Sequence, residues 1–360
     1  MSDTKSMLVT GSGGSAGNNV GWSLRVSSDG RALSLTGTDS DRTSLELNRS
    51  LDNAYKIPNA SDPRYLIILN KIIRRQKVEG VFPQPDPELG TISQAQGKLL
   101  AKTFLPDPST VSICLDKYAA LLKWHATGLR DRPNLIARAG GGNLEEQLRQ
   151  IRFPCWTRAR QGAGGLMSCL AKDWKTLFHW ISFHWDQGID ADFTVEEYLP
   201  GRDFCFISLW KEGHLITSMV RERLSWVGHR TVGTGGTSKL NRVVHVEDAN
   251  HKALAAIRAI TPKPHGIFCV DLKGDEQGIP KPTEINCRFT TNVHYSTLAS
   301  VKFGKPEWNF PWLAGRMMLD EPFPRCRELD ALPSNLWFTK NVDMGYTIVE
   351  DENWRAAEVT

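Results

Sequence analysis

The sequence lacks any long apolar run. Nothing in its 360 residues approaches the ~18 consecutive apolar residues that a helix needs to cross a bilayer. The first six residues, MSDTKS, also lack the apolar stretch of a secretory signal peptide. These absences argue against a membrane-spanning protein and against a secreted one, and we expect a cytoplasmic protein.

Cysteine is sparse and without pattern. The seven cysteines are scattered, and no Cys-x-x-Cys pair occurs, so we expect reduced thiols and neither a disulfide framework nor a zinc site. Charge of one sign is also not concentrated anywhere. The net charge is +4, without a lysine and arginine block of the kind typical of nucleic-acid binding. Neither a nucleic acid nor a membrane is therefore expected as a partner.

The first hundred residues do have the pattern of an open α/β domain. Short apolar runs at 7–10, 32–35 and 78–82 predict strands. Between the last two, residues 65–75 (YLIILNKIIRR) have apolar side chains at helical spacing. Strands that alternate with helices indicate a parallel sheet.

A glycine turn follows the first strand and has two interpretations. Gly11, Gly13 and Ala16 match the dinucleotide-binding fingerprint, and Asp39 and Asp41 near the end of the second strand supply the acidic residue that usually follows it. The alternative is that the glycines only make a tight turn from strand to helix. The choice depends on the rest of the chain.

The most informative pattern lies near residue 284. In a strand, Glu284, Asn286 and Arg288 share one face, because successive side chains alternate. An acid, an amide and a cation on one half-buried face are costly to desolvate, unless a divalent cation and an anionic ligand bind there. Asp271, on the preceding predicted strand, can supply a second carboxylate, and the polar turn 273–278 predicts a hairpin between them.

A second glycine cluster and an isolated lysine lie in the middle of the chain. Arg158 ends a predicted strand, and Gly162, Gly164 and Gly165 follow in a loop before a return strand. Glycine loops beside cations can cover phosphates, because backbone N–H groups approach closely, although many hairpins also have glycine tips. Lys117 opens a predicted helix, where it can reach a phosphate or be a solvated side chain.

A short linker joins two predicted strands downstream. It contains Glu196, Glu197, Tyr198 and Leu199, followed by a Pro-Gly step and Asp203. Such a linker can present backbone donors and acceptors to a planar base, and its acids can accept hydrogen bonds from an amino group or from ribose hydroxyls.

Taken in order, these four pieces resemble the ATP-grasp superfamily, and within it the branch similar to the large chain of carbamoyl-phosphate synthase and to the pyrrolysine-pathway ligase. The resemblance implies α/β and α+β architecture, with a Rossmann-like pre-ATP-grasp domain at 1–107 and an ATP-grasp domain at 108–330. The latter divides into a lid subdomain at about 117–195 and a catalytic subdomain at about 196–330, followed by an appended segment at 331–360. In this branch the glycine turn need not bind a dinucleotide, so we prefer the tight-turn interpretation.

The resemblance also assigns roles. Asp271, Glu284 and Asn286 match the residues that hold two Mg²⁺ ions (or Mn²⁺ as a substitute) on the ATP phosphates. Arg288 and Arg158 match catalytic cations, Arg288 at the acyl phosphate. The positions that match ATP contacts are Lys117, Arg158, Gly162, Gly164, Gly165, Glu196, Glu197, Tyr198, Leu199 and Asp203. The ribose position is often glutamate in this superfamily, so the shorter Asp203 is a departure.

The implied reaction is phosphorylation of a substrate carboxylate to an acyl phosphate, which an amine, typically of an amino acid, then attacks to release ADP and phosphate. Candidate substrate-binding residues are Arg221, Arg223, Arg288 and Asn292, with surface charge as the alternative for the first two. Two other functions stay open: a carboxyphosphate or carbamoyl-phosphate type of kinase, and a non-catalytic nucleotide-binding module. The resemblance is compatible with a homodimer and does not fix the oligomeric state.

Overall fold

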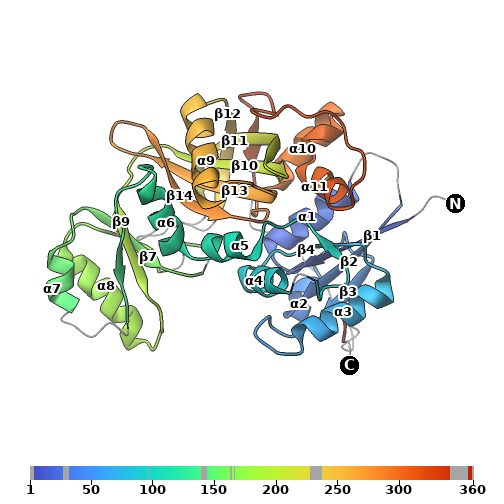
Figure 1. The fold of residues 1–360 in the computed structure, drawn as a ribbon, viewed down its shortest axis with the longest axis horizontal. Coiled ribbons are helices and arrows are strands. Elements are labelled where there is room, and N and C mark those ends of the chain that lie inside the picture. The colour runs from blue at the N-terminus through green and yellow to red at the C-terminus, as the bar shows by residue number, and fades with distance from the viewer. Residues whose placement is uncertain are drawn as a thin grey trace.

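The computed structural model describes residues 4–26, 32–95, 97–138, 144–162, 164–165, 167–227, 237–340 and 356–358. The described residues form three β-sheets with helices packed against them. In Figure 1 the large sheet lies along the top, with the N-terminal sheet below it at one end and a small sheet at the other. Within these residues, no helix is long and apolar enough to cross a membrane.

The N-terminal sheet is parallel, as the alternation of strands and helices predicts. Its strands, in spatial order, are β16 (Ala356–Glu358), β3 (Asn53–Lys56), β2 (Leu33–Asp39), β1 (Lys5–Thr10), β4 (Gly80–Phe82) and β5 (Lys102–Thr103). The connecting helices are α1 (Ser15–Arg25), α2 (Arg42–Leu45), α3 (Tyr65–Gln76) and α4 (Asp86–Gln94). Each strand pair in this sheet is parallel.

Helix α3 forms where the apolar spacing predicts it. It buries Tyr65, Leu69, Ile72 and Ile73, which recur at intervals of three and four residues on the face toward the sheet. The helix ends at Lys77, which adopts the left-handed conformation that commonly terminates a helix.

The glycine turn after β1 is explained by close packing. A Cβ atom on Gly11 would lie 2.3 Å from Cγ of Pro85, and a Cβ on Gly17 would lie 2.3 Å from the carbonyl oxygen of Gly11. The backbone N–H of Gly13 donates to Oδ2 of Asp39 at 2.9 Å. Protein atoms therefore account for the glycines and for Asp39, which supports the tight-turn interpretation over the dinucleotide site.

The small sheet carries its own core. Its strands, in spatial order, are β6 (Asn134–Ile136), β9 (Phe193–Glu197), β7 (Cys155–Ala159) and β8 (Cys169–Ala171). Helices α7 (Leu144–Arg149) and α8 (Trp174–Asp186) pack against this sheet. In α8, buried Leu177 and Ile181 are four residues apart and face Phe193 and Val195 of β9 within one apolar cluster.

The large sheet is antiparallel and lies between two apolar layers. Its strands, in spatial order, are β14 (Pro280–Asn286), β13 (Gly266–Gly274), β10 (Asp203–Lys211), β11 (His214–Trp226), β12 (Ser238–Val244) and β15 (Trp337–Thr339). Helices α5 (Pro108–Cys114), α6 (Lys117–Ala126) and α9 (Glu247–Ile260) pack on one side, and α10 (His294–Phe303) and α11 (Phe310–Met318) on the other. A 3₁₀ turn, η1, spans Pro306–Trp308.

Three details differ from the expectations. Helix α6, expected in the lid, packs on α9 instead, where Trp124 Nε1 donates to the carbonyl oxygen of Ala256 at 3.1 Å. The small sheet therefore begins at β6 rather than at residue 117. The segment after residue 331 is not a separate appendage, because β15 extends the large sheet and β16 extends the N-terminal sheet. Strand β14 ends at Asn286, so Arg288 lies just beyond the strand.

Candidate ATP and metal site

A cavity of about 690 Å³ lies between the small sheet and the large sheet. This volume is in the range that holds small molecules and cofactors. Each candidate site residue named from the sequence belongs to its lining: Lys117, Arg158, Gly162, Gly164, Gly165, Glu196, Glu197, Tyr198, Leu199, Asp203, Arg221, Arg223, Asp271, Glu284, Asn286, Arg288 and Asn292. Residues from distant parts of the sequence thus meet at one site.

The expected metal ligands lie on neighbouring strands. Asp271 of β13 pairs directly with Glu284 of β14, and Asn286 is two residues further along the same strand. Glu284 and Asn286 face the cavity, whereas Ile285 between them is 1% exposed in the core behind the sheet. The alternation predicted for this strand is therefore confirmed.

The donor set fits a hard divalent cation. Two carboxylates and one amide oxygen can be offered to Mg²⁺, which completes its coordination with waters and phosphate oxygens. The described residues hold no group of three or more His, Cys, Asp or Glu side chains placed for a metal. A metal here would thus rely on Asp271, Glu284 and Asn286 together with oxygen atoms of its ligand, as expected for a metal carried by a nucleotide.

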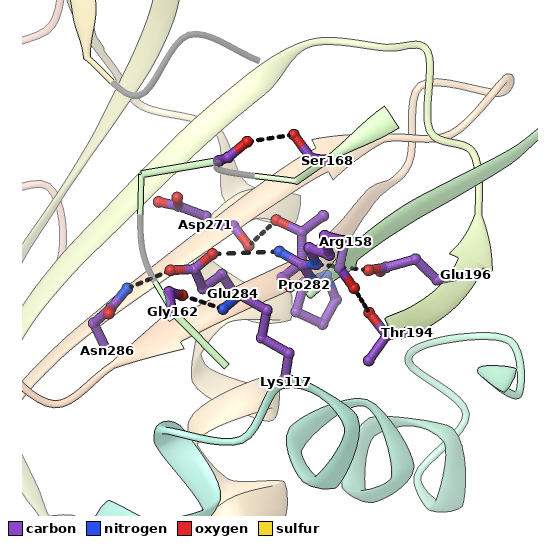
Figure 2. Close-up of polar contacts among 12 residues, drawn as sticks. Lys117, Arg158, Gly162, Ser168, Thr194, Glu196, Asp271, Pro282, Glu284 and Asn286 are labelled. Atoms are coloured by element: carbon purple, nitrogen blue, oxygen red, sulfur yellow. Dashed lines mark hydrogen bonds and ion pairs between the residues drawn. The ribbon is translucent and has the colours of Figure 1, made fainter. Parts of the chain in front are cut away.

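Arg158 lies at the centre of a buried ion-pair network. Its Nε is 2.9 Å from Oε1 of Glu196, and its NH1 is 3.3 Å from Oε2 of Glu284. The other oxygen of Glu196 pairs with Arg130 at 2.9 Å, and both side chains are almost fully buried. In Figure 2, Arg158 lies between Glu196 and Glu284. This network links β7 and β9 of the small sheet to β14 of the large one.

Lys117 faces the cavity and not the solvent. Asp116 caps α6, accepting from the backbone N–H of Ala119 at 3.1 Å, and pairs with Arg160 at 2.6 Å. Lys117 Nζ donates to the carbonyl oxygen of Gly162 in the glycine loop (Figure 2). Burial lowers the pKa of Lys117, although the nearby Glu284 carboxylate opposes this effect. Lys117 is therefore half-buried against the glycine loop, and its contact with a phosphate stays a prediction.

The glycine loop joins β7 to β8 above the metal ligands. Gly162, Gly164 and Gly165 have φ angles of 103°, 76° and 67°, in a region that L side chains adopt rarely. A Cβ on Gly162 or on Gly164 would meet nothing within 4 Å, so backbone conformation and not crowding requires glycine there. Ala163 and Leu166 lie outside the described residues.

The predicted nucleotide linker follows β9, but its acids are already engaged. Glu197 pairs with Arg130 at 2.9 Å and with Lys281 at 2.7 Å. Burial of Glu197 raises its pKa, but Arg130 and Lys281 outweigh burial, so the pKa is lowered overall. Tyr198 and Leu199 line the cavity after the strand ends. The Glu197 carboxylate thus holds the end of β9 in place through two cations, and contact of the linker with a base stays a prediction.

The expected ribose and substrate positions are also charge-paired. Arg223 lies between Asp203, at 2.5 Å, and Asp271, at 2.9 Å, and its own side chain is 13% exposed. Arg288 pairs with Asp86 of the N-terminal domain at 2.7 Å. Arg223 thus pairs with two acids of the cavity wall and does not face open space.

Sequence reasoning missed two of these partners, Asp86 and Arg130. Asp86 lies in the proline-rich run after β4, which contains no recognisable motif. Arg130 follows α6 in a short linker without a recognisable motif. Their roles come from long-range contacts with Arg288 and Glu196, which no local pattern reports.

Comparison with known proteins gives the fold. No family model matches the sequence, and no curated protein matches it. Among solved structures, the L-amino acid ligase from Bacillus licheniformis aligns with 89% of this chain and 75% of its own, at 14% identity and a TM-score of 0.63. The N5-carboxyaminoimidazole synthetase from Staphylococcus aureus, complexed with ADP, aligns with 90% and 80%, at 14% identity and a TM-score of 0.67.

A third solved structure is similar over a comparable length. It is the biotin carboxylase domain of 2-oxoglutarate carboxylase from Hydrogenobacter thermophilus, in complex with MgADP and bicarbonate. It aligns with 92% of this chain and 73% of its own, at 16% identity and a TM-score of 0.65. At such identities these likenesses show a common fold, with one parallel and two antiparallel sheets, and leave the reaction to be argued from the site.

Proposed function

We propose that this chain, which has the ATP-grasp fold, is an ATP-dependent ligase. It would phosphorylate a substrate carboxylate to an acyl phosphate and couple it to an amine, typically of an amino acid, with release of ADP and phosphate. We further propose that it belongs near the carbamoyl-phosphate-synthase and pyrrolysine-pathway-ligase branch. The main support is that Asp271, Glu284 and Asn286 face the same cavity as Lys117 and Arg158.

The chemistry requires two anions, a carboxylate and a terminal phosphate, to approach each other. Bound Mg²⁺ would supply charge neutralisation on the phosphate oxygens. Lys117 and Arg158 contribute fixed positive charge at one end of the cavity, and Arg288 contributes it beyond the end of β14. Charges held in place before reaction stabilise a developing transition state without reorganisation.

The glycine loop would protect the product. An acyl phosphate hydrolyses readily, so water must be excluded until the amine attacks. The loop from Gly162 to Gly165 lines the cavity and contacts Lys117 through the Gly162 carbonyl. A loop whose backbone angles need glycine can close over a ligand with few side chains in the way.

The alternative is a carboxyphosphate type of kinase. Two of the similar structures are a carboxyaminoimidazole synthetase and a biotin carboxylase domain in complex with bicarbonate, and a third is an L-amino acid ligase. The same phosphate and metal residues would serve either reaction. Which substrate accepts the phosphoryl group therefore distinguishes them.

The decisive experiment is a phosphate-release screen with ATP and Mg²⁺. Carboxylates and amino acids are offered in pools, with bicarbonate alone in a parallel reaction and mass spectrometry of the coupled product. A ligase releases phosphate only with a carboxylate and an amine, and the product mass equals their sum less one water. Release with bicarbonate alone would favour the kinase, and ATP binding without turnover in any pool would favour a non-catalytic module.

A further inference from the structure

A buried polar network lies beside the metal ligands, where β11 and β12 meet the start of α10. Arg221, which is 2% exposed, donates to Oγ of Ser238 at 3.3 Å and to Oδ1 of Asn241. Asn241 Nδ2 donates to the hydroxyl of Tyr295 at 3.3 Å, and Asn292 Nδ2 donates to Ser238 Oγ at 2.8 Å. Of these residues, Arg221, Ser238 and Asn292 line the cavity.

Arg221 differs from the other arginines of the cavity in its partners. Arg158, Arg223 and Arg288 each form an ion pair with at least one carboxylate. Across the described part of the chain, Arg221 has only a hydroxyl and an amide oxygen as hydrogen-bond acceptors. Its Nε is buried without a hydrogen-bond partner. A buried cation that lacks a carboxylate is costly, and an anionic ligand would remove that cost.

Two further basic side chains add to the positive field. Burial and the charge of Arg221 lower the pKa of Lys340, just after β15, to about 8. Burial, together with Lys340, lowers the pKa of His294 to about 4, so this imidazole is neutral at pH 7. Two cations, Arg221 and Lys340, are thus close enough to repel each other.

The C-terminal segment helps to build this network. In the register of β12 and β15, Asn241 pairs with Phe338 and Leu240 with Thr339. The Phe338 ring stacks on Tyr295, with centroids 4.7 Å apart and planes at 12°. This contact holds the tyrosine hydroxyl that accepts from Asn241, and Asn241 in turn orients the guanidinium of Arg221.

We propose that Arg221, with Asn292 and Lys340 beside it, binds a second substrate carboxylate, one that is not phosphorylated, and that β15 is part of this subsite. This inference rests on the proposed ligase function and specifies its substrates. The carboxylate belongs either to the amino-acid acceptor or to a dicarboxylic donor. A planar guanidinium matches a carboxylate by paired hydrogen bonds, which gives orientation as well as charge.

The test is direct binding to the full chain, measured by ligand-observed NMR with MgADP present. Two matched pairs of probes are used: L-alanine against L-alaninamide, and succinate against butyrate. Preference for L-alanine over its amide assigns the subsite to the acceptor, and preference for succinate over butyrate assigns it to the donor. If MgADP binds and neither pair shows a preference, the inference is overturned while the proposed function stands. If MgADP does not bind, the proposed function itself fails.

Variants then locate the binding. Lys340→Met and Arg221→Gln are expected to weaken the preferred probe by at least about tenfold, with MgADP affinity within about twofold of wild type. Lys239→Met is the matched control, because Lys239 is an exposed lysine on β12. If Arg221→Gln fails to fold, the probe affinity of Lys340→Met still tests the proposal, because Lys340 is only half-buried. Equal probe affinity in Lys340→Met and wild type would overturn the role of β15.

Discussion

The acids expected to hold metal are paired with arginines. Glu284 lies 3.3 Å from Arg158, and Asp271 lies 2.9 Å from Arg223. A divalent cation at these carboxylates would compete with the arginines, since both would be attracted to the same oxygens. Arg158 would then be available to a phosphate in the same cavity.

The Glu284 carboxylate gives the most direct prediction. Glu284→Gln keeps the shape of the side chain and removes the metal-binding charge, so ATP turnover should fall by at least about a hundredfold. The thermal unfolding midpoint should stay close to that of wild type, because the Glu284 side chain is 28% exposed. Turnover is measured as ADP formation, and Glu276→Gln in the exposed hairpin turn is the control. Wild-type turnover in Glu284→Gln would remove the metal assignment.

Lys117 is the second residue with a defined expectation. Lys117→Ala removes a buried cation that faces the cavity beside Gly162, so the KM for ATP should rise at least several-fold. Lys123→Ala, an exposed lysine on the same helix, should leave it unchanged. The measurement is initial rate against ATP concentration at saturating Mg²⁺. An unchanged KM for ATP in Lys117→Ala would indicate that Lys117 is a solvated side chain that does not contact the phosphates.

Glu88, in the first turn of α4, should make stability depend on pH. Burial raises the pKa of its carboxyl group to about 7, and Thr10 and Tyr65 oppose this only in part. The folded chain therefore keeps a proton that the unfolded chain loses near pH 4.5, so the stabilisation is complete below that pH and is lost as the pH rises through 7. The loss amounts to about 3 kcal/mol.

Glu88→Gln should abolish this part of the pH dependence. Urea unfolding of wild type and variant at pH 5 and pH 8 measures it. Parallel profiles for the two proteins would show that Glu88 titrates normally in the folded state.

At the scale of elements, the β13–β14 hairpin was predictable because its signal is local. Alternation fixes which side chains of β14 face the cavity. The pairing of Asp271 with Glu284 additionally requires a shift in register between Asp271 and Leu272, which the polar turn alone does not predict. The position of α6 was not predictable in the same way. Its residue pattern indicates a helix, but whether it packs on the lid or on α9 depends on Trp124 meeting Ala256, a contact between residues far apart in sequence.

The role of β15 was hidden for a related reason. Strand β15 is three residues long, and the contacts of its side chains depend on its register with β12. No local pattern in residues 337–339 predicts that Phe338 stacks on Tyr295.

A substitution at Phe338 tests what this stacking does. Phe338→Leu keeps apolar volume but loses the flat contact that holds the Tyr295 hydroxyl near Asn241, so Arg221 is less well oriented. The KM for the substrate with the second carboxylate should rise by about tenfold, with the KM for ATP unchanged. Trp337→Leu, an exposed neighbour on the other face of β15, is the control. Equal rises in both KM values would indicate a general structural effect.

At the scale of the whole molecule, the N-terminal domain packs on α10 and α11, which cover one side of the large sheet, through apolar and polar contacts. Asn309 Nδ2 donates to the carbonyl oxygen of Ser23 at 2.8 Å, and Thr297 bonds the Ser23 hydroxyl at the same distance. Asn19 Nδ2 donates to the carbonyl oxygen of Thr291, next to Asn292 in the cavity wall. Helix α1 of the N-terminal domain therefore supports one wall of the cavity.

Asp86 connects the N-terminal domain to the cavity, because it contacts Arg288 in the cavity wall. It opens α4 and pairs with Arg288 at 2.7 Å. Burial alone would lower the pKa of Arg288, but Asp86 outweighs burial and the pKa is raised. Asp86→Asn removes this charge, so turnover should fall by about tenfold through a misplaced Arg288, while the affinity for MgADP stays the same. Stability should fall by about 2 kcal/mol, the cost of losing a charged hydrogen bond.

The control for Asp86→Asn is Asp62→Asn in the same domain. Asp62 pairs with Arg64, whose side chain is 72% exposed, so losing that pair should change neither turnover nor the unfolding midpoint measurably. Turnover and urea unfolding are measured for both variants beside wild type. If Asp86→Asn behaves like Asp62→Asn, the contact between the domains does not position Arg288. If it loses stability but keeps full turnover, the ion pair holds the domains together and the catalytic role of Arg288 fails.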